Sequence, residues 1–341
     1  VMNPAAYKTV ISNGLVLDKN GNKMSKRLGN AVDPFEELDK YGADALRWYM
    51  LTNAQPWDNL KFDEAGVDEV RRKFFGTLYN TYSFFALYAN VDGFDPKAAK
   101  VEYSKRPEID RWIISLLNSL KKKVVASYED YDITSAGRMI QDFVCDDLSN
   151  WYVRRSRERF WGKGMAGDKE AAFATLYHIL ETMSRLTAPF TPFMAENMYR
   201  NLVCSVDKDA PISVHMTDFP VCDETYISAE LEQHMRDLLE VVVLGRSCRS
   251  ESGLKVRQPL AKILVAGAGT HLDDLILDEL NIKEIAYLAD ETALCDVSYK
   301  ANFKTLGKAY GKRMKEIAAA FGVISQQEIN AVQAAEAQGN A

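Results

Sequence analysis

The sequence predicts a mainly α-helical protein with a short α/β segment at residues 1–63, a helical bundle at 64–222 and a small α+β domain at 223–341. First, the 341 residues include 19 glycines and 10 prolines, below the usual combined share of roughly 12%, and this favours helices over loop-rich structure. Second, apolar residues recur at helical spacing through most of residues 63–205. Third, short strand-like runs bounded by glycine lie before and after that region.

The first part opens with two strand candidates, residues 8–11 and residues 15–17. Asn13 and Gly14 lie between them, and an Asn-Gly pair supplies the positive φ that a two-residue hairpin turn needs. We therefore expect a β-hairpin here. It is followed at residues 18–29 by a polar, positively charged segment that we call the basic loop.

Helices follow the basic loop. Asp33 suits a helix cap, Pro34 suits the first helical position, and residues 42–50 predict a second helix. In the second part, the helical pattern is interrupted by glycines and prolines, which end helices. The helices expected there span residues 64–91, 107–128, 133–161, 169–187 and 191–204.

The third part mixes helices and strands. Helices are expected at residues 229–247 and 303–321. Strands are expected at residues 261–266, 284–288 and 293–299. The last helix has an apolar face and a separate basic face, which carries Lys304, Lys308, Lys312 and Lys315.

Composition and charge narrow the class of protein. The chain is 47% hydrophobic and 26% charged, which is typical of a soluble globular protein. Its formal net charge is −6, so local patches must hold any polyanionic partner. The five cysteines are far apart in sequence, which favours neither a disulfide framework nor a zinc site and suits the reducing cytoplasm.

One uncharged run, residues 74–91, is long enough to cross a membrane. Polar residues interrupt this run, and polar groups are costly in lipid. We interpret it as a buried helix of the bundle and expect no membrane partner.

The basic loop contains the most informative sequence, Lys23-Met24-Ser25-Lys26-Arg27, between Gly21 and Gly29. Two ammonium groups and a hydroxyl on a mobile loop can close over a polyphosphate and balance the charge on its oxygens. The alternative is a solvated basic loop, because short motifs recur by chance.

A second candidate site is an arginine-rich helical segment. Arg154, Arg155, Arg157 and Arg159 alternate with Trp151, Tyr152, Phe160 and Trp161. Guanidinium groups bind phosphates and stack on bases, so this composition suits RNA. The alternative is a bundle helix whose arginines pair with acids such as Glu158 and Asp147. A weaker RNA-binding candidate is the basic face with Lys304, Lys308 and Lys312, because such a face is usually only solvated.

The first part of the chain resembles the KMSKS region of the class I aminoacyl-tRNA synthetases for Ile, Val, Leu and Met. The resemblance lies in the string from Asn13 through the basic loop to Asn30, in Asp33-Pro34 and in residues 41–47. The last motif position is Arg27 instead of serine, a frequent variant in this group. Residues 110–113, 147–161 and 188–196 are similar to the anticodon-binding bundle of the isoleucyl-tRNA synthetases. The C-terminal strings resemble the tail of the eukaryotic-type isoleucine enzymes and favour isoleucine over valine: residues 254–260, 277–285 and 302–307.

The resemblance implies a reaction and its participants. Isoleucine, ATP with Mg²⁺ and tRNA would give isoleucyl-tRNA, AMP and pyrophosphate in a monomeric, cytoplasmic enzyme. Lys23, Ser25 and Lys26 would be catalytic, and together with Met24 they would bind ATP. The three parts would then be the end of the catalytic domain, the anticodon-binding domain and a C-terminal domain. The cysteine spacing does not support the zinc site of the other bacterial type.

The His-x-Gly-His motif that class I enzymes also need does not occur, because the four histidines are isolated from one another. We therefore interpret the chain as the C-terminal part of such an enzyme, beginning just before the KMSKS loop, and expect it to be inactive alone. Two alternatives remain: the corresponding part of a valyl-tRNA synthetase, and a non-catalytic RNA-binding module.

Overall fold

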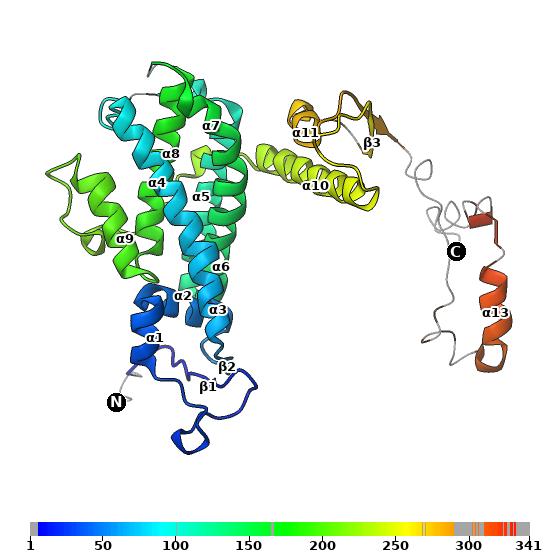
Figure 1. The fold of residues 1–341 in the computed structure, drawn as a ribbon, viewed down its shortest axis with the longest axis horizontal. Coiled ribbons are helices and arrows are strands. Elements are labelled where there is room, and N and C mark those ends of the chain that lie inside the picture. Colours follow the sequence, from blue (N-terminus) through cyan, green and yellow to red (C-terminus); the bar gives the residue numbers. More distant parts are fainter. Residues whose placement is uncertain are drawn as a thin grey trace, which may run out of the picture. The chain divides into compact units, whose positions relative to one another are not determined.

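The computed structural model describes two compact units, Val1–Glu232 and Gln233–Ala341 (Figure 1). The first unit holds both of the parts expected at residues 1–63 and 64–222, and the three-part division stays a prediction. The described residues are 6–99, 101–164, 167–267, 269, 271–289, 302, 304, 306, 310–322, 324–325, 328–329 and 331.

The strand pairing of the first segment differs from the expected hairpin. Strand β1 (Val16–Leu17) pairs in parallel with β2 (Leu60–Lys61), and residues 8–11 form no strand. The chain at Gly14 runs so close to a distant segment that a Cβ there would lie 2.0 Å from the carbonyl oxygen of Asp58. The hairpin prediction was therefore wrong, because this glycine permits a close approach of two backbones instead of a turn.

The two helices expected after the basic loop are confirmed as α1 (Pro34–Tyr41) and α2 (Ala43–Asn53). Asp33 caps α1, since its Oδ1 accepts a hydrogen bond from the backbone amide of Phe35 at 2.9 Å. Helix α2 packs on the bundle through Trp48, whose ring stacks on Phe74 with a centroid distance of 3.9 Å. The basic loop is thereby attached to the bundle within one unit.

The five helical stretches expected in the bundle are all present, and three contain π-helical segments, in which each turn has an extra residue. The first stretch is α3 (Glu64–Val70), η2 (Arg71–Phe75, π) and α4 (Gly76–Asp92). After the short turn η3 (Tyr103–Lys105) comes α5 (Glu108–Glu129). The third stretch is α6 (Ile133–Asp142), η4 (Phe143–Val153, π) and α7 (Arg154–Trp161). The last two are α8 (Asp168–Thr187) and α9 (Pro192–Tyr199) with η5 (Arg200–Cys204, π).

Helices α4, α5, α6 and α8 run side by side around an aromatic core (Figure 1). Phe173 contacts Phe160 and Phe85, with ring centroids 4.9 Å and 6.0 Å apart. The uncharged run at residues 74–91 belongs to this bundle, as predicted, and directs Phe74, Leu78 and Phe85 into the core. Within the described part of the chain, no helix has the length and apolar character that a membrane crossing needs.

Residues 211–220 are irregular and include the short turn η6 (Val214–Met216). The turn η7 (Glu224–Tyr226) follows it. Helix α10 (Ala229–Glu251) contains the boundary between the two units.

The second unit contains a β-α-β element. Strand β3 (Ile263–Ala266) pairs in parallel with β4 (Ile285–Leu288), and α11 (Asp273–Leu280) is the connection that a parallel pair requires. Both strands were predicted, whereas α11 was not. The C-terminal part of the helix expected at residues 303–321 is present as the turn η9 (Gly311–Arg313) and α13 (Met314–Phe321). The strand expected at residues 293–299 lies outside the described residues.

Candidate functional site

A network of short side chains closes the base of the basic loop. Asp18 Oδ1 accepts hydrogen bonds from the backbone amides of Asn20 and Asn22, at 3.0 and 2.8 Å. Asn30 Nδ2 donates to Asp18 Oδ2 at 2.9 Å, so the two ends of the loop are joined. The bond from Asn30, followed by the backbone bonds, lowers the pKa of Asp18 below its ordinary value.

The tip of the loop is a single 3₁₀ turn, η1 (Lys26–Leu28), that begins after Ser25. Ser25 Oγ accepts a hydrogen bond from the amide of Arg27 at 3.3 Å, and the amide of Ser25 donates to Asn30 Oδ1 at 2.8 Å. Gly29 ends the turn with φ 67°. The Ser25 hydroxyl acts as a cap in this geometry and keeps its own hydrogen for donation.

Met24 fixes the loop to the core, while its neighbours point outward. Its side chain packs on a buried cluster formed by Ala45, Tyr49, Leu60, Phe62 and Val67. Lys23 and Lys26 are exposed, and neither forms an ion pair with any residue that the structure describes. The structure thus brings the predicted residues Lys23, Ser25 and Lys26 together on one anchored turn, with both ammonium groups open to an anion.

Sequence reasoning did not identify Asp18 and Asn30, which position this turn. The segment Asp18-Lys19-Asn20-Gly21 carried a usable signal, since aspartate and glycine at such spacing favour a side-chain-stabilised turn. The partner Asn30 carried no comparable signal, because its contact with Asp18 joins residues that are 12 positions apart in the sequence and forms only in the folded loop.

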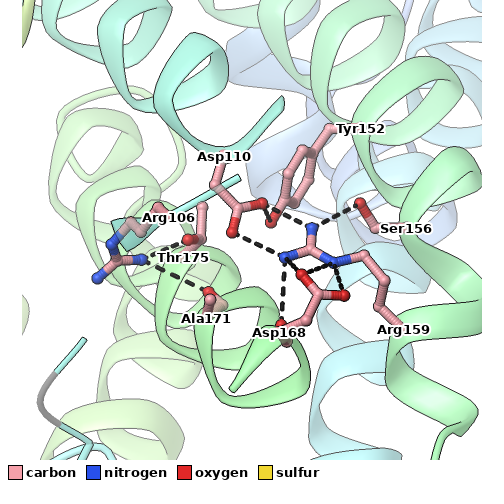
Figure 2. Close-up of polar contacts among 8 residues, drawn as sticks. All are labelled: Arg106, Asp110, Tyr152, Ser156, Arg159, Asp168, Ala171 and Thr175. Atoms are coloured by element: carbon pink, nitrogen blue, oxygen red, sulfur yellow. Dashed lines mark hydrogen bonds and ion pairs between the residues drawn. The ribbon is translucent and has the colours of Figure 1, made fainter. Parts of the chain in front are cut away.

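Arg159 is held in a network of polar side chains within the bundle (Figure 2). Its side chain is 15% exposed and forms a two-bond pair with fully buried Asp110, at 2.7 and 2.9 Å. Its Nε donates to the carboxylate of Asp168 at 2.9 Å, and the remaining donors reach Ser156 Oγ and the Asp168 carbonyl. Every guanidinium donor of Arg159 has a partner in this network, so the side chain contributes to the packing of the bundle.

The same network orders neighbouring helices (Figure 2). The Tyr152 hydroxyl donates to Asp110 Oδ1 at 2.9 Å, and burial raises the pKa of Tyr152 well above its ordinary value. Nearby, the Arg106 guanidinium, which precedes α5, donates hydrogen bonds to two acceptors on α8, Thr175 Oγ1 and the Ala171 carbonyl. Asp110 therefore ties α5 to η4 and α7, and Asp168 links α7 to the start of α8.

The other arginines of the predicted interface lie at or near the surface of α7. The guanidinium carbons of Arg154 and Arg155 lie 5.5 and 5.6 Å from the ring centroid of Trp151, within cation–π range. Trp151 is only 4% exposed, so it supports these arginines but offers no ring face to a base. Arg157 is exposed, and Trp161, one turn further along, is 55% exposed.

The two predicted lysines that are described in the second unit, Lys304 and Lys312, are exposed. Lys308 lies outside the described residues. Among the described residues, no group of three or more His, Cys, Asp and Glu side chains has an arrangement that could hold a metal ion.

A cluster of carboxylates lies in the helical stretch that precedes α7: Asp142 ends α6, and Asp146 and Asp147 lie in η4. Burial, then the charges of Asp146, Asp142 and Glu232, raise the pKa of Asp147 to about 7. A pKa above that of the unfolded chain stabilises the protein at acid pH, and this contribution is lost as pH rises from about 4 to about 7.

Asp147→Asn is expected to make the first unit more stable above pH 7, by about 2 kcal/mol, and to change little at pH 4. The amide has the same shape as the carboxylate and carries no charge. Urea unfolding at pH 4, 6 and 8 measures this, with Glu129→Gln as the matched control, because Glu129 is exposed and does not contribute to the pKa shift of Asp147. A stability difference that does not depend on pH would contradict the assignment.

Families of tRNA ligases match both the region of the basic loop and the region of the α7 arginines. Residues 1–63 match the family "tRNA synthetases class I (I, L, M and V)", and residues 110–265 match the family "Anticodon-binding domain of tRNA ligase". The isoleucine–tRNA ligase of Bacteroides fragilis is 52% identical over 336 residues, which are 96% of this chain and 29% of that protein. Isoleucine–tRNA ligase 2 of Bacillus cereus is 45% identical over 329 residues, covering 95% of this chain and 31% of that protein.

Among solved structures, a ternary complex of Agrobacterium radiobacter K84 agnB2 LeuRS with tRNA and LeuAMS matches with a TM-score of 0.47 and 22% identity. The match covers 64% of this chain and 24% of that chain. This chain therefore spans less than a third of the length of the relatives that it matches.

Proposed function

Since this chain belongs to the class I tRNA synthetases of the I, L, M and V group, we propose that it forms the loop and tRNA-binding part of an isoleucine–tRNA ligase. The complete enzyme joins isoleucine to tRNA with ATP and releases AMP and pyrophosphate. The observation that carries this proposal is the pair of exposed ammonium groups, Lys23 and Lys26, on a turn anchored beside an arginine-bearing bundle.

The basic loop acts in the first half-reaction. ATP enters as its Mg²⁺ complex, and the isoleucine carboxylate attacks the α-phosphate to give the aminoacyl-adenylate and pyrophosphate. Negative charge grows on the departing pyrophosphate, where Lys23 and Lys26 supply opposite charge and Ser25 donates a hydrogen bond. Met24 holds the loop on its core cluster, so the charges are already oriented when the loop closes.

The bundle serves the second half-reaction by holding the tRNA. Arg154, Arg155 and Arg157 on α7 contact phosphates of the anticodon arm, and the basic face with Lys304, Lys308 and Lys312 adds weaker contacts. Under this proposal the functional division is residues 1–63, 64–222 and 223–341. The isoleucine-specific tRNA is bound by a monomer in the cytoplasm.

Binding of tRNA by this chain is expected to weaken as salt rises, because phosphate contacts dominate the affinity of an acidic protein for RNA. The double variant Arg154→Glu/Arg155→Glu should weaken binding further and reduce the salt slope by about 2, one for each phosphate that an arginine no longer neutralises. Filter binding or fluorescence anisotropy between about 50 and 200 mM salt measures both quantities.

The matched control is the double variant Lys304→Glu/Lys312→Glu, which makes the same change of charge on the other basic face. A smaller decrease in affinity is expected there. Equal decreases at both faces, or no decrease at the arginines, would show that α7 has a structural role and does not contact the RNA.

A further inference from the structure

Leu17 has a basic residue paired to it on each side. In the parallel pair of β1 and β2 its partner is Lys61, and on its other side it forms an antiparallel bridge with Lys23. Residues directly opposite one another on adjacent strands direct their side chains to the same face. Lys23 and Lys61 therefore lie on one face of a small sheet, with Leu17 between them.

The opposite face of β2 is buried. Leu60 and Phe62, the neighbours of Lys61, belong to the buried cluster on which Met24, the neighbour of Lys23, also packs. Side chains alternate between the two faces of a strand, so Lys61 and Lys23 both point away from the core. Adjacent strands are about 4.8 Å apart, which puts the two lysine backbones about 10 Å apart.

The stem of Lys61 extends over the base of the basic loop. A Cβ at Gly21, where φ is +87°, would lie 3.2 Å from Lys61 Cε and 3.7 Å from Lys61 Nζ. Because Gly21 has no side chain, there is room beside it for the side-chain stem of Lys61. Lys61 is exposed, and within the described residues no carboxylate pairs with it.

We propose that Lys61 is a third ammonium of the loop site and contacts the triphosphate of ATP together with Lys23 and Lys26. This rests on the function proposed above. Lys61 is attached to a paired strand, whereas Lys26 belongs to the turn that closes. Its charge can therefore meet the phosphates on binding, before charge develops in the transition state, and its main effect is on ATP affinity.

The test is isoleucine-dependent ATP–pyrophosphate exchange by the complete ligase with varied ATP. Lys61→Ala and Lys61→Gln should each raise the KM for ATP by about 10-fold, the usual worth of one charge-assisted contact, and leave the KM for isoleucine unchanged. Lys61→Arg should retain most of the affinity, since a surface charge contact does not need a compact ammonium. Lys19→Ala is the matched control, because Lys19 is an exposed lysine of the same loop outside the register with Leu17.

The outcomes separate this proposal from the one on which it rests. If Lys61→Ala behaves like Lys19→Ala while Lys26→Ala is impaired, Lys61 has no role and the loop function stands. If Lys26→Ala is also unimpaired, the loop function itself fails. If Lys61→Ala leaves exchange intact but weakens tRNA binding, Lys61 faces RNA phosphates, and its assignment to ATP is overturned.

Discussion

Lys26→Ala in the complete ligase is expected to slow formation of the aminoacyl-adenylate by about 10²–10³, the usual effect of removing one preorganised electrostatic contact. Lys26 is exposed at the start of η1, and the turn is held by Ser25, Asn30 and the packing of Met24. Its ammonium is therefore positioned without being neutralised. Because the contact strengthens as charge grows on the leaving pyrophosphate, the rate should fall while the affinity for isoleucine stays nearly unchanged.

Lys26→Arg should not restore the full rate. A planar guanidinium has a fixed fork of donors and cannot take the place of a compact ammonium on a flexible stem when the phosphate geometry changes. Pre-steady-state measurement of adenylate formation tests both variants. A normal rate, or an effect confined to isoleucine binding, would mean that the basic loop is only solvated.

Asp110→Ala is expected to lower the free energy of unfolding of the first unit by about 3–5 kcal/mol, because it removes the buried counter-charge of Arg159 and leaves only the exposed carboxylate of Asp168. Asp110 is fully buried, and Arg159 and Tyr152 both bond to its carboxylate (Figure 2). All five tryptophans precede residue 162, so tryptophan fluorescence during urea unfolding reports on the first unit alone.

Two variants serve as controls for this effect. Asp168→Ala removes the partner that is 56% exposed and should cost about 1 kcal/mol or less, because water can replace it. Arg157→Ala removes an exposed arginine of the same helix and should change stability by less than about 0.5 kcal/mol. If Asp110→Ala costs no more than Asp168→Ala, the network does not hold the bundle together and Arg159 must be reconsidered as an RNA contact.

The sequence by itself determined the helices of the bundle, the loop motif and the family. The helices could be predicted because a helix is a local structure: its apolar period and its glycine and proline breaks lie within a single segment. The loop could be recognised because Lys23, Ser25 and Lys26 are close together in the chain, so one turn brings them together.

Only the tertiary structure decided which residues pair across long distances. Leu17 pairs with Lys61 and not with residues 8–11, because Leu60, Phe62 and Met24 pack together in one core cluster. Arg154, Arg155, Arg157 and Arg159 look equivalent in sequence, yet it is Arg159 that meets Asp110 from α5 and Asp168 from the start of α8. Whether an arginine lies in the core or at the surface depends on which carboxylates the other helices place beside it. The positions of those carboxylates cannot be read from the segment that contains the arginine.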